Sequence, residues 1–195
     1  MESNIYISGV GGQGAIRLGQ IIADYALQKG KKIKFFKEVG MAQRGGAVHC
    51  EIRIGNVFGS RIPPYSSDAT VVMELSEGLK ALEFIKPGGT VILNNNKVYP
   101  IDLMTKPEKY PEFQEIEELF KKTKAKIIWI NAKKIAIDLG LSVAENVVLL
   151  GALSYILSFD KRVLLKILKK NIPREIEKNL YAFQEGYRIT EGIKK

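Results

Sequence analysis

The chain has 195 residues, 46% hydrophobic and 26% charged, as in ordinary folded proteins, and its net charge of +9 comes from dispersed lysines without a nucleic-acid-binding motif. No stretch of about 18 apolar residues and no export signal is visible, so we expect a cytoplasmic protein that binds neither membrane nor nucleic acid. The single cysteine, Cys50, excludes an internal disulfide or an iron–sulfur cluster held by this chain alone, and the single histidine, His49, argues against a His-rich metal site.

The first predicted strand, residues 5–8, runs into a glycine-rich turn and then into a predicted helix over 15–28. The glycines of this turn follow the spacing Gly-x-Gly-x-x-Gly and are Gly9, Gly11, Gly12 and Gly14. Without Cβ atoms, such a turn lets backbone N–H groups approach a ligand at the helix N-terminus, although a tight turn without a ligand needs the same glycines. The Gln13 amide favours contact with a ligand or a partner backbone.

A second glycine-rich segment follows the next predicted strand, residues 32–36. Its candidate contact residues are Met41, Gln43, Arg44, Gly45 and Gly46. The Arg44 guanidinium can grip a carboxylate or a phosphate in two places; the alternatives are a surface arginine or an internal ion pair. Met41 is either an apolar contact to a partner or a core filler. Parallel strands place both segments at one edge of the sheet, and this edge is the candidate site.

Glu38 supports a rival interpretation. It lies just beyond the second strand, where a dinucleotide-binding fold places the acid that binds a ribose, so the chain could be a stand-alone NAD(P)-binding oxidoreductase. The alternative is an exposed loop charge. His49 and Cys50 lie on opposite faces of one strand without a cluster of metal or nucleophile partners, which favours structural roles.

The remaining pattern alternates strands and helices. A hairpin is predicted from 47–54 and 57–62 around Gly55-Asn56. Further strands are expected at 69–73, 90–93 and 126–130, a turn at Pro87-Gly88-Gly89, and helices at 77–84, 112–122 and 132–139. From residue 143 onward the pattern is helical, with helices at 147–157, 163–170 and 174–187.

Together these elements predict an α/β fold: an open, mostly parallel sheet with an inserted β-hairpin, helices on both faces and a helical C-terminal part. We expect one domain over residues 1–195, with the sheet in about 1–140 and the helical part in about 143–195. Ser142 and Glu145 have the spacing of a capping box for the apolar helix. If that helix begins at the loop edge, Asn146 reaches the glycine loops.

The pairing of Gly9-Val10-Gly11-Gly12-Gln13-Gly14 with Gly40-Met41-Ala42-Gln43-Arg44-Gly45-Gly46 resembles the gamma-type subunit of the 2-oxoacid:ferredoxin oxidoreductases. The Met-Ala-Gln-Arg-Gly-Gly form is most similar to the small (beta) subunit of the indolepyruvate enzyme. Ser66-Ser67-Asp68-Ala69 and Lys86-Pro87-Gly88-Gly89-Thr90 extend the resemblance, which spans about residues 1–190.

The resemblance implies an accessory subunit of an enzyme that oxidatively decarboxylates indolepyruvate or other arylpyruvates to acyl-coenzyme A and passes electrons to ferredoxin. Thiamine diphosphate, Mg and 4Fe-4S clusters are then expected in a large partner subunit. This chain is expected to hold no metal, no catalytic residue and no tightly bound cofactor. Its glycine loops are expected to contact coenzyme A, the thiamine cofactor of the partner or only protein. A gamma subunit of a pyruvate, 2-oxoglutarate or ketoisovalerate enzyme is the related alternative.

Overall fold

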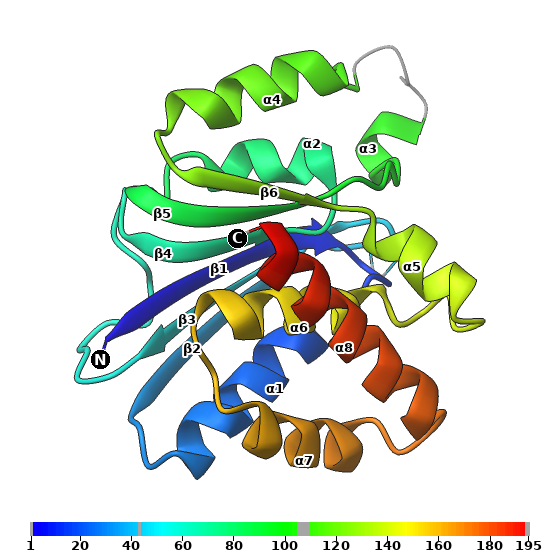
Figure 1. Cartoon of the computed structure of the whole chain (residues 1–195). Helices are drawn as coiled ribbons and strands as arrows, with labels where there is room; N and C mark the ends of the chain where they lie inside the picture. The colour runs from blue at the N-terminus through cyan, green and yellow to red at the C-terminus, as the bar shows by residue number, and fades with distance from the viewer. Residues whose placement is uncertain (1, 43, 105–109, 194–195) are drawn as a thin grey trace.

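The computed structural model describes residues 2–42, 44–104 and 110–193 (Figure 1). In this part of the chain, strands form a six-stranded sheet of order β2-β3-β1-β4-β5-β6. The strands are β1 Ser3–Val10, β2 Ile33–Val39, β3 Ala47–Ile54, β4 Ser67–Val72, β5 Ile85–Asn94 and β6 Lys126–Ile130. Only β3 runs against the others, since it pairs antiparallel with both β1 and β2 while β1, β4, β5 and β6 pair parallel. The predicted mostly parallel sheet is confirmed.

The inserted hairpin is present, but its position differs from the prediction. It is formed by β2 and β3, whereas residues 57–62 form no strand. Gly55 has a φ of 117° and begins a loop, so the Gly55-Asn56 turn signal marks a true turn. The chain after that turn returns to β4 as an irregular connection instead of pairing with β3.

Helices cover both faces of the sheet, as predicted (Figure 1). The larger core lies on the side of α1 Ala15–Gln28, α5 Ala132–Asp138, α6 Glu145–Ile156, α7 Lys161–Asn171 and α8 Ile176–Ile193. The smaller core lies on the side of α2 Leu75–Gly78, the 3-10 turn Leu79–Ala81 and α4 Phe113–Lys122. Ile5 and Ile7 point into the larger core and Tyr6 into the smaller one, because strand side chains alternate between faces.

Several boundaries differ from the sequence prediction. The helix predicted at 77–84 is the short α2 followed by the 3-10 turn, and α3 Ile101–Met104 lies in a stretch predicted to be irregular. The predicted Pro87-Gly88-Gly89 turn is a kink inside β5, where Gly88 has a φ of 78° and the register with β4 shifts. Among the described residues, none of the helices has the length and apolar character needed to span a bilayer.

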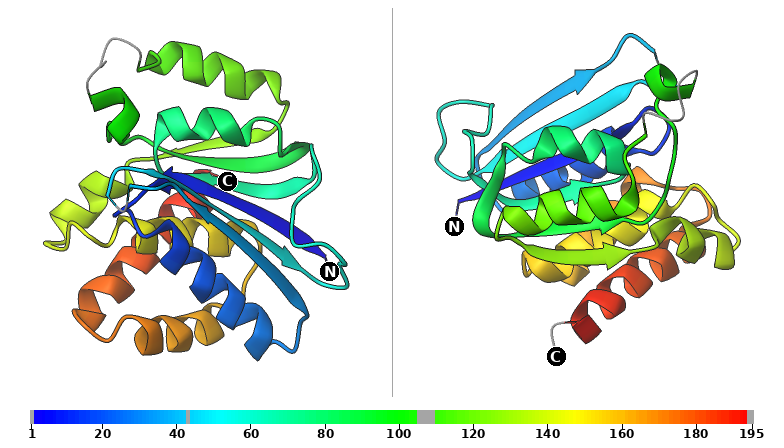
Figure 2. Two further views of the ribbon diagram at one scale, coloured as in Figure 1. Left: turned by 180° about the vertical axis from the view of Figure 1, so that it is seen from behind. Right: turned by 90° about the horizontal axis from the view of Figure 1, so that it is seen from above.

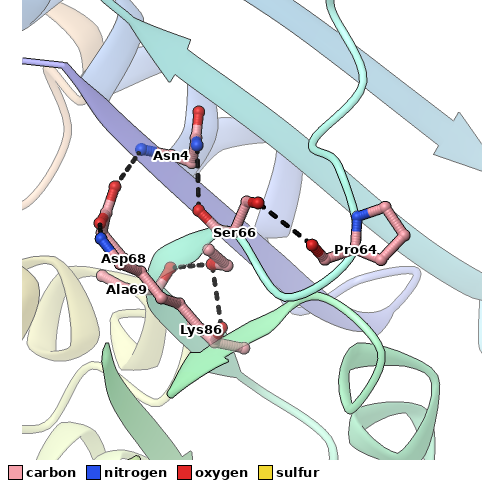
Figure 3. A network of polar contacts seen from close by, with 8 residues as sticks. Asn4, Pro64, Ser66, Asp68, Ala69 and Lys86 are labelled. Atoms are coloured by element: carbon pink, nitrogen blue, oxygen red, sulfur yellow. Dashed lines mark hydrogen bonds and ion pairs between the residues drawn. The ribbon is translucent and has the colours of Figure 1, made fainter. Parts of the chain in front are cut away.

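A polar network ties β1, β4 and β5 together near the start of β1, whereas the first glycine turn follows the other end of that strand (Figure 3). Asp68 accepts hydrogen bonds from the Asn4 backbone N–H at 2.9 Å and from Lys86 Nζ at 2.8 Å. Asn4 Nδ2 also donates to the Ser66 carbonyl at 2.9 Å. The sequence motifs around Asp68 and Lys86 therefore fasten β1, β4 and β5 at a distance from the candidate site.

Candidate functional site

The two glycine-rich segments lie side by side and are hydrogen-bonded to each other, as the strand arrangement predicts. Gly11 N–H donates to the Gly46 carbonyl at 2.8 Å, and Gly45 N–H donates to the Gly11 carbonyl at 3.1 Å. The start of α3 lies beside the second segment, because Ile101 N–H donates a hydrogen bond to the Gly45 carbonyl at 2.9 Å. Since β3 pairs directly with β1, the loop between β2 and β3 meets the turn after β1 at this edge.

Two glycines of the first turn have backbone angles that other residues rarely adopt. Gly14 has a φ of 83°, and a Cβ there would lie 2.5 Å from Asn146 Nδ2. Gly12 has a φ of 107°, and open space surrounds the position of its absent Cβ. Gly14 therefore permits the close approach of α6, whereas Gly12 keeps the surface of the loop open. Gly9, at the end of β1, lies against the side chain of Gln13.

The Gln13 amide differs from the sequence expectation, because it is largely used within the chain. Its Oε1 accepts from Val10 N–H at 2.9 Å and its Nε2 donates to the Met73 carbonyl at 3.0 Å. Gln13 is 8% exposed. The side chain thus holds the glycine turn against the end of β4, and only its remaining surface faces the neighbouring cavity.

That cavity has a volume of about 190 Å³ and is bounded on one side by Gly11, Gly12 and Gln13. Glu145, at the start of α6, lies on the opposite side and is only 4% exposed. Ligand pockets usually measure about 300–1,000 Å³. The cavity is therefore too small to enclose a cofactor by itself.

Glu145 is a feature of the site that sequence reasoning missed. Burial raises its pKa, and Lys133 and hydrogen bonds from Gln13 and Asn96 offset this only in part; Asn96 Nδ2 lies 3.1 Å from the carboxylate. The expected capping box is absent, because Ala144 is the N-cap of α6 and no side chain bonds there. An acid at the start of a helix that is mostly apolar on all sides is the signal that could have revealed the inward-facing carboxylate.

The N-terminus of α1 opens beside this cavity. Its N-cap is Gly14, no described side chain caps it, and its first turn contains no acidic residue. Lys133 Nζ is held on the other side of the cavity by the Ser142 carbonyl at 3.0 Å. Free backbone N–H groups and a nearby ammonium group form a suitable environment for an anionic group such as a phosphate.

The second loop is strongly exposed. Arg44 is exposed and forms no ion pair with a described carboxylate. Met41 is fully exposed, so it is not a core filler. Gln43 lies outside the described residues. Four more large apolar side chains are exposed around the glycine loops, and with Met41 they form the loop-edge surface: Val39, Met41, Ile101, Met104 and Val143.

The structure places the two remaining candidates, Asn146 and Glu38, at different sites. Asn146 reaches the glycine turn, since its Nδ2 donates to the Gly14 carbonyl at 3.4 Å. Glu38 does not reach the first glycine turn, because β3 separates β2 from β1. It lines another cavity together with His49. The arrangement expected for a ribose-binding acid beside the first glycine turn is therefore not found.

The described residues also contain few groups suited to covalent or metal chemistry. Burial raises the pKa of the Cys50 thiol to about 12, so this side chain is an inert part of the larger core. Among the described residues, no three His, Cys, Asp or Glu side chains are grouped so that they could hold a metal ion.

The sheet order and the paired loops define an α/β protein that presents an open loop edge instead of an enclosed active site. The family model for pyruvate ferredoxin/flavodoxin oxidoreductase matches residues 4–189, and the chain belongs to this family. This confirms the resemblance inferred from the two glycine motifs.

Two relatives and one solved structure illustrate the relationship. The indolepyruvate oxidoreductase subunit IorB of Methanothermobacter thermautotrophicus is 37% identical over 190 residues, covering 96% of this chain and 97% of the relative. The subunit of the same name in Archaeoglobus fulgidus is 35% identical over 190 residues, covering 96% and 94%. The crystal structure of the keto/oxoacid ferredoxin oxidoreductase gamma subunit of Geobacter sulfurreducens is 25% identical, with a TM-score of 0.72 and coverage of 97% and 99%.

Proposed function

We propose that the chain is the small subunit of a cytoplasmic indolepyruvate ferredoxin oxidoreductase and that it has no complete active site of its own. The observation that carries this proposal is the incomplete cavity of about 190 Å³, which opens at an edge surrounded by exposed apolar side chains. Exposed apolar side chains gathered beside a cavity are typical of an interface with another chain. The names of the two relatives favour indolepyruvate as the substrate of the complex.

In this proposal the partner subunit supplies the redox chemistry. Thiamine diphosphate, Mg and 4Fe-4S clusters held by that partner would supply the chemistry of decarboxylation and of electron transfer to ferredoxin. The donor set of this chain does not fit a cluster, because its single cysteine is buried in the core. The residues do fit an anionic group of coenzyme A, which would meet the N-terminus of α1 and Lys133.

The first test is an anaerobic pull-down of the tagged full chain from its native cells. We expect a large chain containing iron and thiamine to co-elute, and the eluate to reduce a dye when indolepyruvate and coenzyme A are added. Faster dye reduction with pyruvate, 2-oxoglutarate or a branched 2-oxoacid would instead assign the related alternative. A chain that elutes alone and binds NAD(P) saturably would contradict the proposal.

Arg44 provides a residue-level test of the same proposal. Because its guanidinium is exposed and unpaired with described carboxylates, Arg44→Ala should weaken assembly or lower turnover by about tenfold, while the melting temperature of the isolated subunit stays within a few degrees. The matched control is Arg162→Ala, which removes an exposed arginine from α7. The role of Arg44 is refuted if both variants assemble and turn over like the unmodified chain.

A further inference from the structure

A second cavity lies on the other side of the sheet and shares no lining residue with the cavity beside the glycine loops. The helices on this face are α2, which packs on β1 and β4, and α4, so the part over β2 and β3 is left without a helix (Figure 2, right). Tyr6, Ser8 and His49 contribute to its floor. Its volume of about 390 Å³ falls within the ~300–1,000 Å³ range of small-molecule sites.

The floor of this cavity contains a polar group without a partner. Ser8 is 2% exposed, and its hydroxyl makes no hydrogen bond with any described residue. Strand alternation places Ser8 on the same face as Tyr6, which is the face of the cavity. Buried hydroxyls are nearly always hydrogen-bonded in folded proteins, so this oxygen is available to a ligand.

The cavity has more carboxylates than free cations. Both of its long cationic side chains are already paired: Arg61 Nε lies 2.7 Å from the buried Glu51, and Lys80 Nζ lies 2.7 Å from Glu77. The other two carboxylates of the lining, Glu38 and Glu83, pair with no lysine or arginine of the described residues. A chain of net charge +9 therefore has a locally acidic cavity.

Aromatic rings line the same floor. The Tyr6 ring stacks on the His49 ring with centroids 5.5 Å apart and on the Phe84 ring at 4.6 Å. Ring faces attract cations, as the guanidinium of Arg61 shows by lying 4.2 Å from the centroid of Phe36 beside the cavity. The faces of these rings are occupied by one another and by Arg61, so the rings form an apolar floor and the carboxylates select a positively charged organic ligand.

We propose that this cavity binds a small organic cation carrying an ammonium or guanidinium group. Glu38 and Glu83 face the positive charge, and the Ser8 hydroxyl oxygen accepts one of its N–H groups. An anionic ligand is disfavoured because Arg61 and Lys80 are already engaged by Glu51 and Glu77. Gly40 and Ala47, at the two ends of the second glycine-rich segment, line this cavity, but it shares no lining residue with the cavity beside Gly11, Gly12 and Gln13. The proposal therefore does not rest on the proposed role in 2-oxoacid oxidation.

The single histidine makes binding directly observable. His49 gives the only histidine ring signals in a proton NMR spectrum of the full chain, and its ring lies on the cavity floor. We expect agmatine, which carries both cationic groups, to shift these signals saturably at low ionic strength, and 0.15 M salt to weaken the binding. The neutral analogue butylurea and the anion butyrate should produce no saturable shift. Equal shifts with butylurea, or none with agmatine, would overturn the proposal.

Substitutions in the cavity test which side chains contact the bound cation. Glu38→Gln and Glu83→Gln should each weaken agmatine binding about threefold, whereas Glu177→Gln on the exposed face of α8 should leave it unchanged. Ser8→Ala should also weaken binding, yet its melting temperature should equal or exceed that of the unmodified chain, because an unpartnered buried hydroxyl is unfavourable. Unchanged affinity in both Gln variants, or a lower melting temperature with intact binding in Ser8→Ala, would contradict the assignment.

Discussion

At the scale of single residues, two buried glutamates show how surroundings decide the charge of a carboxyl group. Burial alone raises the pKa of Glu51, but the contacts with His49, the Ile62 N–H and a nearby arginine more than offset this effect and hold it below its usual range. Burial also raises the pKa of Glu145, where Lys133 offsets the effect only in part. Glu51 is therefore a stabilised charge, whereas Glu145 holds its proton to higher pH than an ordinary glutamate.

This difference predicts the pH dependence of a Glu145→Gln variant. Below the ordinary glutamate pKa of about 4.3 both folded and unfolded chains are protonated at this position, so burial carries no ionisation penalty. As pH rises, the unfolded chain releases this proton first, and the folded chain becomes relatively less stable. We expect the free energy of unfolding of Glu145→Gln, relative to the unmodified chain, to increase between pH 4.5 and pH 7.5 by more than ~0.5 kcal/mol.

Urea unfolding of both proteins at the two pH values measures this change. Glu177→Gln, at an exposed position on α8, is the control and should show no such trend. A difference that decreases with pH would mean that Glu145 is stabilised as an anion, and the interpretation of its surroundings would be wrong.

At the scale of elements, the C-terminal part depends on one close crossing of α6 and α8. A Cβ at Gly151 would lie 2.0 Å from the Phe183 carbonyl oxygen, and a Cβ at Gly186 would lie 1.8 Å from that of Val148. Both neighbours are backbone atoms, which cannot swing aside as a flexible side chain can. The two glycines therefore allow the helices to approach more closely than any other residue type would.

We expect Gly186→Ala to destabilise the chain by about 2–3 kcal/mol, because the added methyl group forces the helices apart. For a chain of this size the melting temperature should fall by roughly 5–10 °C. Gly192→Ala is a control in the same helix, with open space around the new methyl group. Alanine there should leave the melting temperature equal or higher, since glycine is a weaker helix former. Equal melting temperatures for both variants would show that the crossing can relax.

Elements with strong local signals were predicted best from the sequence. The last strand, β6, has the predicted bounds Lys126–Ile130, and the three C-terminal helices lie where apolar periodicity places them. The hairpin was misplaced because Gly55-Asn56 resembles a two-residue hairpin turn, whereas the true connection from β2 to β3 contains seven residues. The alternating pattern of residues 57–62 is typical of a strand, but it cannot show whether a neighbouring strand is free to pair with this segment.

The candidate site was also predicted only in part, because some of its features are local in the sequence and others are not. Glycine spacing and strand order are local, so the meeting of the two loops could be anticipated. The internal use of the Gln13 amide depends on the Met73 carbonyl, 60 residues further along the chain. The inward direction of Glu145 is indicated only by the apolar helix that follows it, whereas its partners Asn96 and Lys133 come from other parts of the fold. Such tertiary contacts leave no signal in the spacing of one sequence.

At the scale of the whole molecule, the two ends of the sheet have different characters. The end near the chain's start is fastened by the Asp68 network and continues into the loop that carries exposed Phe58 (Figures 1 and 3). The opposite end carries the glycine loops, the open N-terminus of α1 and the loop-edge surface. Docking of a partner at the second end would cover the apolar side chains and enlarge the small cavity at the same time.

This arrangement predicts different effects for the same substitution at the two ends. Met41→Asp introduces a charge into the loop-edge surface, and desolvating it in an interface should weaken assembly at least tenfold. Phe58→Asp changes an equally exposed apolar side chain at the opposite end, because β3 runs against β1 and carries the chain away from the glycine loops. Both isolated variants should keep their melting temperature, since neither side chain is packed. Co-purification of each tagged variant with the partner measures the effect, and loss of the partner from Phe58→Asp with retention by Met41→Asp would place the interface at the other end of the sheet.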